Sequence, residues 1–171
     1  MGISYYTFQV VSYLIDVYRN KYKPEKNIAK YFLYTMYFPY LFIGPINRYD
    51  DISKTLFETE KKFDCQSAYK GALRIGWGFF KKLIIANRIN VIISTITQNT
   101  GEYNGAFALF AMLLYSIQLY ADFSGGIDIV LGFSKILQIN LKENFNNPYI
   151  SQNIQEFWRR WHISLSSWFR D

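Results

Sequence analysis

Two stretches without any charged residue stand out in the pattern of apolar and polar positions. One runs from Tyr31 to Asn47 (17 residues) and the other from Tyr103 to Ala121 (19 residues). A helix needs about 20 mostly apolar residues to cross a bilayer. Lysines and arginines gather between these stretches, as they do in the connectors of membrane proteins. The pattern therefore predicts an all-α, polytopic membrane protein, with short helices at the membrane interface.

Shorter apolar segments fill in the rest of the chain. Ile3–Tyr18 is predicted to be a helix with a single acid, Asp16. Residues 65–83 alternate basic with apolar and aromatic side chains, which favours a segment lying in the membrane interface. Gly125 and Gly126 are predicted to end the helix that starts near residue 106, because glycine weakens helices. A separate short helix is then expected over residues 129–141, followed by a polar loop over residues 142–148.

The last segment, Tyr149–Asp171, is predicted to be one continuous helix that carries the only histidine, His162. Apolar residues recur there at steps of three and four, which places them on one side of a helix. His162 lies at the edge of that apolar side, next to Ser166. Such an imidazole can be tuned by burial and by its neighbours. From these residues alone, a catalytic histidine and a buried structural histidine both stay open. The recurring positions are Ile154, Trp158, Trp161, His162, Leu165, Trp168 and Phe169.

Composition narrows the class of protein. The net charge is +6 and 20% of the residues are aromatic. This combination is typical either of nucleic-acid binding or of a membrane protein, and the long uncharged stretches favour the membrane and exclude nucleic acid as the expected partner. The single cysteine, Cys65, excludes an internal disulfide, and no spacing of Cys and His typical of a metal site occurs. We expect no bound metal and no bound cofactor.

Two carboxylates, Asp122 and Asp128, flank the Gly125-Gly126 pair. Asp128 could stabilise the first turn of a following helix through the helix dipole. Alternatively, both carboxylates could line a polar site at membrane depth. The residues themselves do not decide between these interpretations.

Four strings resemble the signature of the bacterial membrane-bound O-acyltransferase family, in its alginate O-acetylase-like branch. They are GPINRY, DFSGGID, ENFNNPY and EFWRRWHISLSSWFRD, and they occur in the order the family has them. The resemblance runs from Gly2 to Asp171, so residues 1–171 are interpreted as one partial domain, cut at both ends. The chain departs from the family at Gly126, where tyrosine is usual, and at Ile127, where serine is usual.

This resemblance implies an acyltransferase in the cell (plasma) membrane that crosses it several times. It implies a catalytic pair of histidines, of which His162 is one and orients or helps to deprotonate the acceptor hydroxyl. The second, which the family uses more directly in catalysis, lies further downstream, so that residues 1–171 alone are expected to be inactive. The acyl donor would be acetyl-CoA or another thioester, acting as substrate, and the acceptor an exported polysaccharide, with envelope partner proteins and membrane lipid around the enzyme. The alternatives are D-alanyl transfer to teichoic acid from a carrier-protein thioester, and a non-enzymatic transport or scaffold subunit. Further candidate substrate-binding residues are Asp122, Ser124, Asp128, Asn144, Arg159 and Arg160.

Overall fold

The described part of the chain is helical. The computed structural model describes residues 3–39, 43–57, 63–99 and 101–170, and side chains from residue 6 onward. No strand occurs in these ranges, so the all-α prediction is confirmed for them, as is the first helix. The helices in order are α1 (Ile3–Tyr18), α2 (Ile28–Thr35), α4 (Tyr49–Leu56), α5 (Cys65–Phe79), a π-helix (Phe80–Ala86), α6 (Asn87–Gln98), α7 (Gly105–Ile136), a 3-10 turn (Pro148–Ile150), α8 (Ile154–Arg160) and α9 (Ile163–Arg170).

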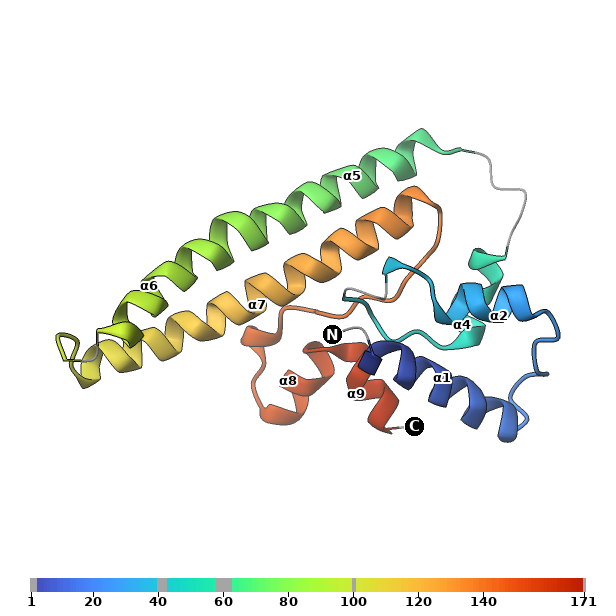
Figure 1. Ribbon diagram of the computed structural model, residues 1–171, viewed down its shortest axis with the longest axis horizontal. Helices are drawn as coiled ribbons and strands as arrows, with labels where there is room; N and C mark the ends of the chain where they lie inside the picture. The colour runs from blue at the N-terminus through green and yellow to red at the C-terminus, as the bar shows by residue number, and fades with distance from the viewer. Residues whose placement is uncertain (1–2, 40–42, 58–62, 100, 171) are drawn as a thin grey trace.

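A long helical hairpin dominates the shape (Figure 1). Its first arm is a continuous rod made of α5, the π-helix and α6, and its second arm is α7, which runs back beside the first. Asn104 starts the second arm, because its side-chain oxygen accepts a hydrogen bond from the backbone N–H of Ala106 at 3.2 Å. Residues 65–83 are therefore part of a longer hairpin, and their position in the membrane interface stays a prediction. They pack along α7 as half of the hairpin.

Four glycines allow the two arms to approach closely. A Cβ atom at Gly71 would lie 2.6 Å from the carbonyl oxygen of Gly132, and one at Gly78 would lie 2.6 Å from that of Gly125. On each arm the two glycines are seven residues apart and so share one face. Small residues at such positions are the usual means by which membrane helices pack tightly.

The predicted helix break at Gly125-Gly126 is therefore wrong, and so is the separate helix over residues 129–141. α7 continues through both glycines to Ile136. Glycine costs a helix about 1 kcal/mol relative to alanine, and packing against the first arm offsets that cost. The polar loop that follows, over residues 142–148, is confirmed as non-helical chain up to the 3-10 turn that starts at Pro148.

Within the described residues, α7 is the one helix that is long and apolar enough to cross a membrane. Its 32 residues span about 48 Å at 1.5 Å per residue. Only 11% of its most apolar window is buried, and its first half exposes Leu109, Met112 and Leu113 by 65–68%. The core helix of a soluble protein would bury such side chains, so α7 is not a buried core helix of the described part of the chain.

The other uncharged stretch, residues 31–47, is not one continuous helix in its described residues, and a kinked or re-entrant segment around Pro39 stays a prediction. α2 ends at Thr35, whose hydroxyl donates back to the carbonyl of Tyr31 at 3.1 Å. Residues 40–42 lie outside the described part of the chain. The segment after them is a loop whose polar groups find partners in other elements, which is why the lack of charge does not require a helix.

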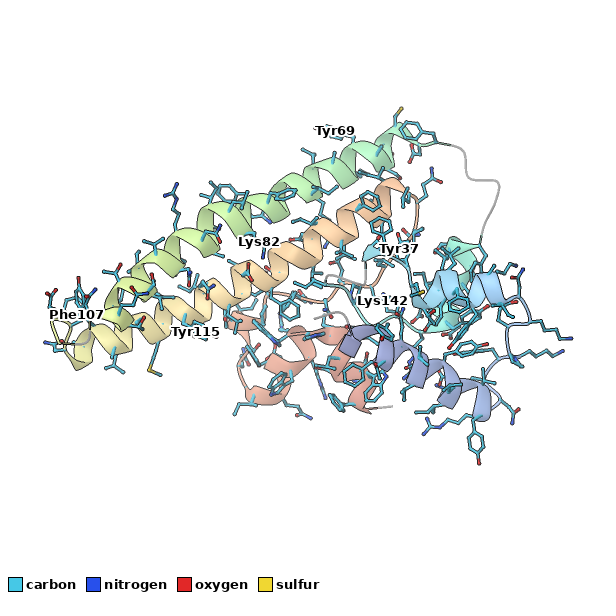
Figure 2. The ribbon with its side chains drawn as sticks, viewed as in Figure 1. Tyr37, Tyr69, Lys82, Phe107, Tyr115 and Lys142 are labelled. Atoms are coloured by element: carbon cyan, nitrogen blue, oxygen red, sulfur yellow. The ribbon has the colours of Figure 1, made fainter. Side chains whose placement is uncertain are left out.

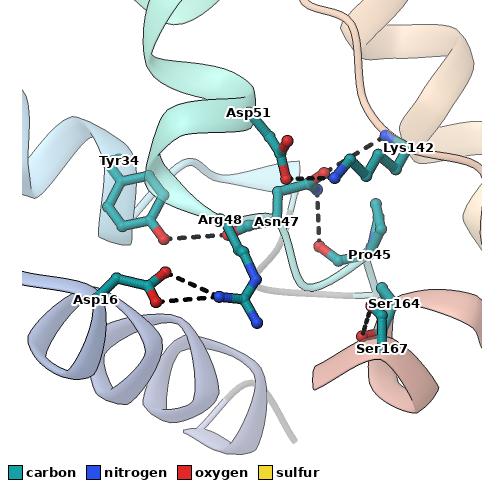
Figure 3. A network of polar contacts seen from close by, with 9 residues as sticks. All are labelled: Asp16, Tyr34, Pro45, Asn47, Arg48, Asp51, Lys142, Ser164 and Ser167. Atoms are coloured by element: carbon teal, nitrogen blue, oxygen red, sulfur yellow. Dashed lines mark hydrogen bonds and ion pairs between the residues drawn. The ribbon is translucent and has the colours of Figure 1, made fainter. Parts of the chain in front are cut away.

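That loop ties the N-terminal helices to the chain after α7 (Figure 3). The Tyr34 hydroxyl donates to the carbonyl of Asn47 at 3.0 Å, and the Asn47 side-chain oxygen accepts from the N–H of Lys142 at 3.4 Å. Arg48 donates to both carboxylate oxygens of Asp16 on α1, at 3.1 and 3.0 Å. The GPINRY string is thus a structural junction between α1, α2 and the loop that leads to the histidine.

A tyrosine-rich core surrounds this junction. Tyr37 reaches from it to α7, where its hydroxyl donates to the hydroxyl of Ser134 at 3.1 Å (Figure 2). Aromatic rings with one polar atom suit such a core, because each ring contributes apolar area and each hydroxyl needs only one partner. The core residues are Tyr13, Tyr34, Tyr37, Ile52 and Ile139.

Candidate functional site

The helix predicted over residues 149–171 is broken at the histidine. α8 ends at Arg160, Trp161 is extended with φ −100° and ψ 128°, and α9 starts at Ile163. His162 itself has φ 45°, in the left-handed region that non-glycine residues rarely adopt. Such a backbone costs about 1–3 kcal/mol and persists only where the surroundings hold it. The prediction of one continuous helix is therefore wrong, and the interruption falls on the candidate catalytic residue.

The loop before α8 holds this junction in place. The carbonyl of Asn144 accepts a hydrogen bond from the N–H of Ile163 at 3.0 Å, and its side-chain oxygen accepts from the N–H of Ser164 at 2.9 Å. The N–H of Asn146 donates to the carbonyl of Arg160 at 2.9 Å. The first N–H groups and last carbonyls of helices lack partners within the helix. The loop supplies those partners at both sides of the break, which fixes the backbone around His162.

His162 is buried beneath α7, with 8% of its surface exposed. Its ring meets Phe123 of α7 edge-on, with the ring centroids 5.0 Å apart. The neighbouring Trp161 stacks on Phe157 at 5.6 Å and meets Phe145 edge-on at 5.1 Å. Burial lowers the pKa of His162, which lies outside α7, from its ordinary value of 6.5. The imidazole is therefore neutral near pH 7 and able to accept a proton.

Three buried polar atoms at this junction lack a hydrogen-bond partner among the described residues. They are Nδ1 of His162, Nδ2 of Asn144 and Oγ of Ser164. Asn144 is fully buried and Ser164 is 5% exposed. Buried polar atoms are almost always paired in folded proteins, so three without a described partner at one strained break mark this junction as the candidate site.

The structure places Asp122, Ser124 and Asp128 elsewhere, inside the hairpin. Asp128 accepts from Nε of Arg74 at 2.9 Å and also pairs with Lys81. The same carboxylate and serine are linked, because Nζ of Lys81 donates to Oγ of Ser124 at 3.0 Å.

Asp122 pairs with Lys82, which lies between the two arms (Figure 2). The described partners of these three residues thus come from the first arm, and α8 lies on the other side of α7 (Figure 1). Of the candidate substrate-binding residues, Asn144 is the one that the structure brings to His162. Substrate roles for the other three stay predictions.

The two adjacent arginines of α8 differ. Arg160 pairs with Glu156 one turn earlier, with Nη2 2.7 Å from Oε1, and donates weakly to the carbonyl of Asn146 at 3.4 Å. Arg159 is exposed on the same helix. Arg160 therefore supports the loop that holds the junction, and a role for Arg159 in substrate binding stays a prediction.

The sequence analysis did not identify Ser164, nor the cations of the first arm that pair with acids of α7. These cations are Arg74, Lys81 and Lys82. A signal for the cations was present: no acid occurs between Asp64 and Glu102, so cations of that segment needed partners from another element. The seven-residue spacing of glycines on both arms was a second usable signal. Nothing in the sequence distinguishes Ser164 from Ser166 and Ser167.

The chain is similar to known proteins over its whole length. The model of the membrane-bound O-acyltransferase (MBOAT) family matches residues 25–171. The chain is 39% identical over its whole length to a probable alginate O-acetylase of Pseudomonas syringae pv. tomato, of which it covers 32%. It is 36% identical to a teichoic acid D-alanyltransferase of Bacillus subtilis, covering 44% of it. It is 29% identical to a peptidoglycan O-acetyltransferase of Helicobacter pylori, covering 37% of it. The chain spans about a third of the length of the alginate O-acetylases that it matches.

Proposed function

Since this chain belongs to the membrane-bound O-acyltransferase family, we propose that its protein transfers an acetyl group from a thioester to hydroxyl groups of an exported polysaccharide. The alginate O-acetylases at 39% identity support this acyl group and this class of acceptor. The observation that carries the proposal is the buried, neutral imidazole of His162, held in a strained backbone, whose Nδ1 has no partner in the part of the chain that the structure describes.

The chemistry follows from that imidazole. An alcohol is a weak nucleophile near neutral pH, and a neutral histidine activates it by accepting its proton as the carbon–oxygen bond forms. The break between α8 and α9 is held by hydrogen bonds from the Asn144 loop. These bonds fix the position of the His162 imidazole. The aromatic rings of Phe123 and Trp161 exclude water from one side, which limits hydrolysis of the thioester.

The hairpin supports a position of the protein in the membrane. The first arm runs beside α7, and its cations Arg74, Lys81 and Lys82 are paired with acids of α7 or the following loop. Its outward side chains include Leu73, Trp77 and Leu83, which are 51–57% exposed. Paired charges and exposed apolar side chains suit a position beside α7 in the membrane, whereas the exposed Arg88 of α6 needs water or lipid headgroups. We therefore propose that the protein lies in the plasma membrane, with α7 as one of its several crossings, alongside envelope partner proteins that handle the polysaccharide.

Transfer of D-alanine to teichoic acid is the second candidate, favoured by the relative at 36% identity. The two candidates share the acceptor chemistry of an alcohol and differ in the donor. Acetyl transfer uses a small neutral acyl group, whereas D-alanyl transfer uses an acyl group with an ammonium charge on a carrier protein.

The test is a transfer assay in membranes that contain the protein expressed from its full gene. Acetyl-CoA with a labelled acetyl group is supplied with alginate oligosaccharides, and in parallel D-alanyl carrier protein is supplied with lipoteichoic acid. We expect acetyl transfer, reduced about 100- to 10,000-fold by His162→Ala, and unchanged by Gln155→Ala on the exposed face of α8. The wild-type rate should rise with pH, and the midpoint of that rise should lie below the ordinary histidine value of 6.5, because burial lowers the pKa of His162. Equal rates in wild type and His162→Ala would refute the role of His162, and transfer of D-alanine alone would favour the second candidate.

A further inference from the structure

Asn144 and Ser164 are held together in a way that leaves two hydrogen-bond donors free beside His162. The side-chain oxygen of Asn144 accepts from the N–H of Ser164 at 2.9 Å. The nitrogen of that carboxamide and the hydroxyl of that serine therefore both lie next to this one hydrogen bond. Both atoms are buried and unpaired among the described residues.

The chemistry of these atoms defines what can satisfy them. The carboxamide nitrogen only donates, and a serine hydroxyl can donate as well, while Nδ1 of a neutral imidazole accepts when the proton is on Nε2. A ligand that pairs all three must offer an oxygen acceptor to the two donors and a hydrogen to the imidazole. An acyl carbonyl together with an alcohol has this pattern.

We propose that Nδ2 of Asn144 and Oγ of Ser164 donate hydrogen bonds to the carbonyl oxygen of the acyl thioester and stabilise the negative charge that develops on it. This inference rests on the proposed function. The oxygen of the Asn144 carboxamide accepts from the N–H of Ser164, which leaves the nitrogen of the same group as the donor for the substrate.

In the first step, the alcohol oxygen bonds to the carbonyl carbon, its proton passes to Nδ1 of His162, and the carbonyl π electrons move to the oxygen. That oxyanion is the species which Asn144 and Ser164 hold. In the second step the carbonyl re-forms, the carbon–sulfur bond breaks, and the thiolate takes the proton from the imidazolium. The products are an ester and a free thiol, and the imidazole returns to its neutral form.

Ser164→Ala is the decisive variant, measured in the same membranes with labelled acetyl-CoA and alginate oligosaccharides. We expect kcat to fall about 100-fold, as for the loss of one oxyanion donor, with KM for acetyl-CoA little changed. The melting temperature should not fall, because the deleted hydroxyl has no partner in the described structure. Ser164→Thr, which restores the hydroxyl, should recover activity.

Matched controls come from the same two segments. Ser167→Ala removes a hydroxyl that donates to the Ser164 carbonyl at 2.9 Å, so it should lower the melting temperature slightly and leave kcat unchanged. Asn144→Asp keeps the acceptor for the Ser164 N–H and removes the free donor, so it should lower kcat at least as much as Ser164→Ala. Asn146→Ala, in the same loop with an exposed side chain, should change neither quantity.

The outcomes separate this inference from the proposed function. An inactive His162→Ala beside a fully active Ser164→Ala would leave the function standing and overturn the inference. A parallel loss of kcat and melting temperature in Ser164→Ala would also overturn it, since it would assign the hydroxyl a structural role. No transfer by the wild-type protein with either donor would overturn both.

Discussion

The two faces of α7 differ in whether their polar groups have partners. On the face toward the first arm, Asp128, Ser124 and Asp122 are each engaged by a cation. On the face toward α8 and α9, His162 packs against Phe123, and its Nδ1 and two buried polar atoms of Asn144 and Ser164 have no partner in the described chain. Phe123 and Ser124 are consecutive residues, so a single helical step separates the two environments.

This difference indicates that the two faces of α7 have different roles. A buried charge costs several kcal/mol unless it is paired, and an unpaired buried donor or acceptor costs about 1–3 kcal/mol. The hairpin removes those costs internally and needs no ligand. The junction retains them, together with a left-handed histidine, and a ligand with matching polar groups would relieve them. Stability is therefore concentrated in the hairpin and chemistry at the junction.

The largest expected effect on stability comes from breaking the paired face. Asp128→Ala leaves Arg74 and Lys81 without their shared carboxylate, whose side chain is only 13% exposed. We expect a loss of about 3 kcal/mol in the free energy of unfolding, measured by denaturation in detergent. The control is Glu143→Ala, which removes another partner of Arg74 whose side chain is 57% exposed and should cost about 1 kcal/mol or less. Similar losses in the two variants would contradict the account of the hairpin as a buried charge network.

A somewhat smaller effect is expected from the glycine contacts. In Gly132→Ala, the new Cβ would lie 2.6 Å from the carbonyl oxygen of Gly71, and separating the arms should cost about 1–3 kcal/mol. Gly76→Ala on the first arm is the matched control, because a Cβ there meets nothing within 4 Å. It should be neutral or stabilising. Denaturation curves of both variants measure the contrast, and an unaffected Gly132→Ala would show that the close approach does not matter.

The smallest expected effect on stability concerns the junction at His162, on the other face of α7. His162→Gly and His162→Ala both remove the imidazole and should be equally inactive. Glycine adopts a positive φ without strain, so His162→Gly should be more stable than His162→Ala by about 1 kcal/mol. In a regular helix the order would be reversed by about the same amount. Finding alanine the more stable residue at this position would contradict the strained junction.

Much of the molecule could be read from the pattern of residues. The helix at Ile3–Tyr18, the polar loop after α7 and the long apolar segment from residue 106 follow from periodicity and charge alone. His162 was identifiable as the leading candidate because it is the only histidine and stands within the string most typical of the family. These features are local, or depend on composition, so the chain order suffices to establish them.

Other features depend on which segments meet. The sequence predicts that Gly125 breaks a helix, but in the structure Gly125 packs closely against Gly78 and the helix continues. The sequence also predicts a membrane segment over residues 31–47, but Asn47 makes hydrogen bonds to α2 and to the loop before α8. The break at His162 exists because Asn144, 18 residues earlier, supplies the hydrogen bonds that start α9. The sequence by itself determined the helical class, the apolar segments and the identity of the candidate base. Only the tertiary structure decided where helices continue or break and which polar groups remain unpaired, because both depend on hydrogen bonds and contacts between residues distant in the chain.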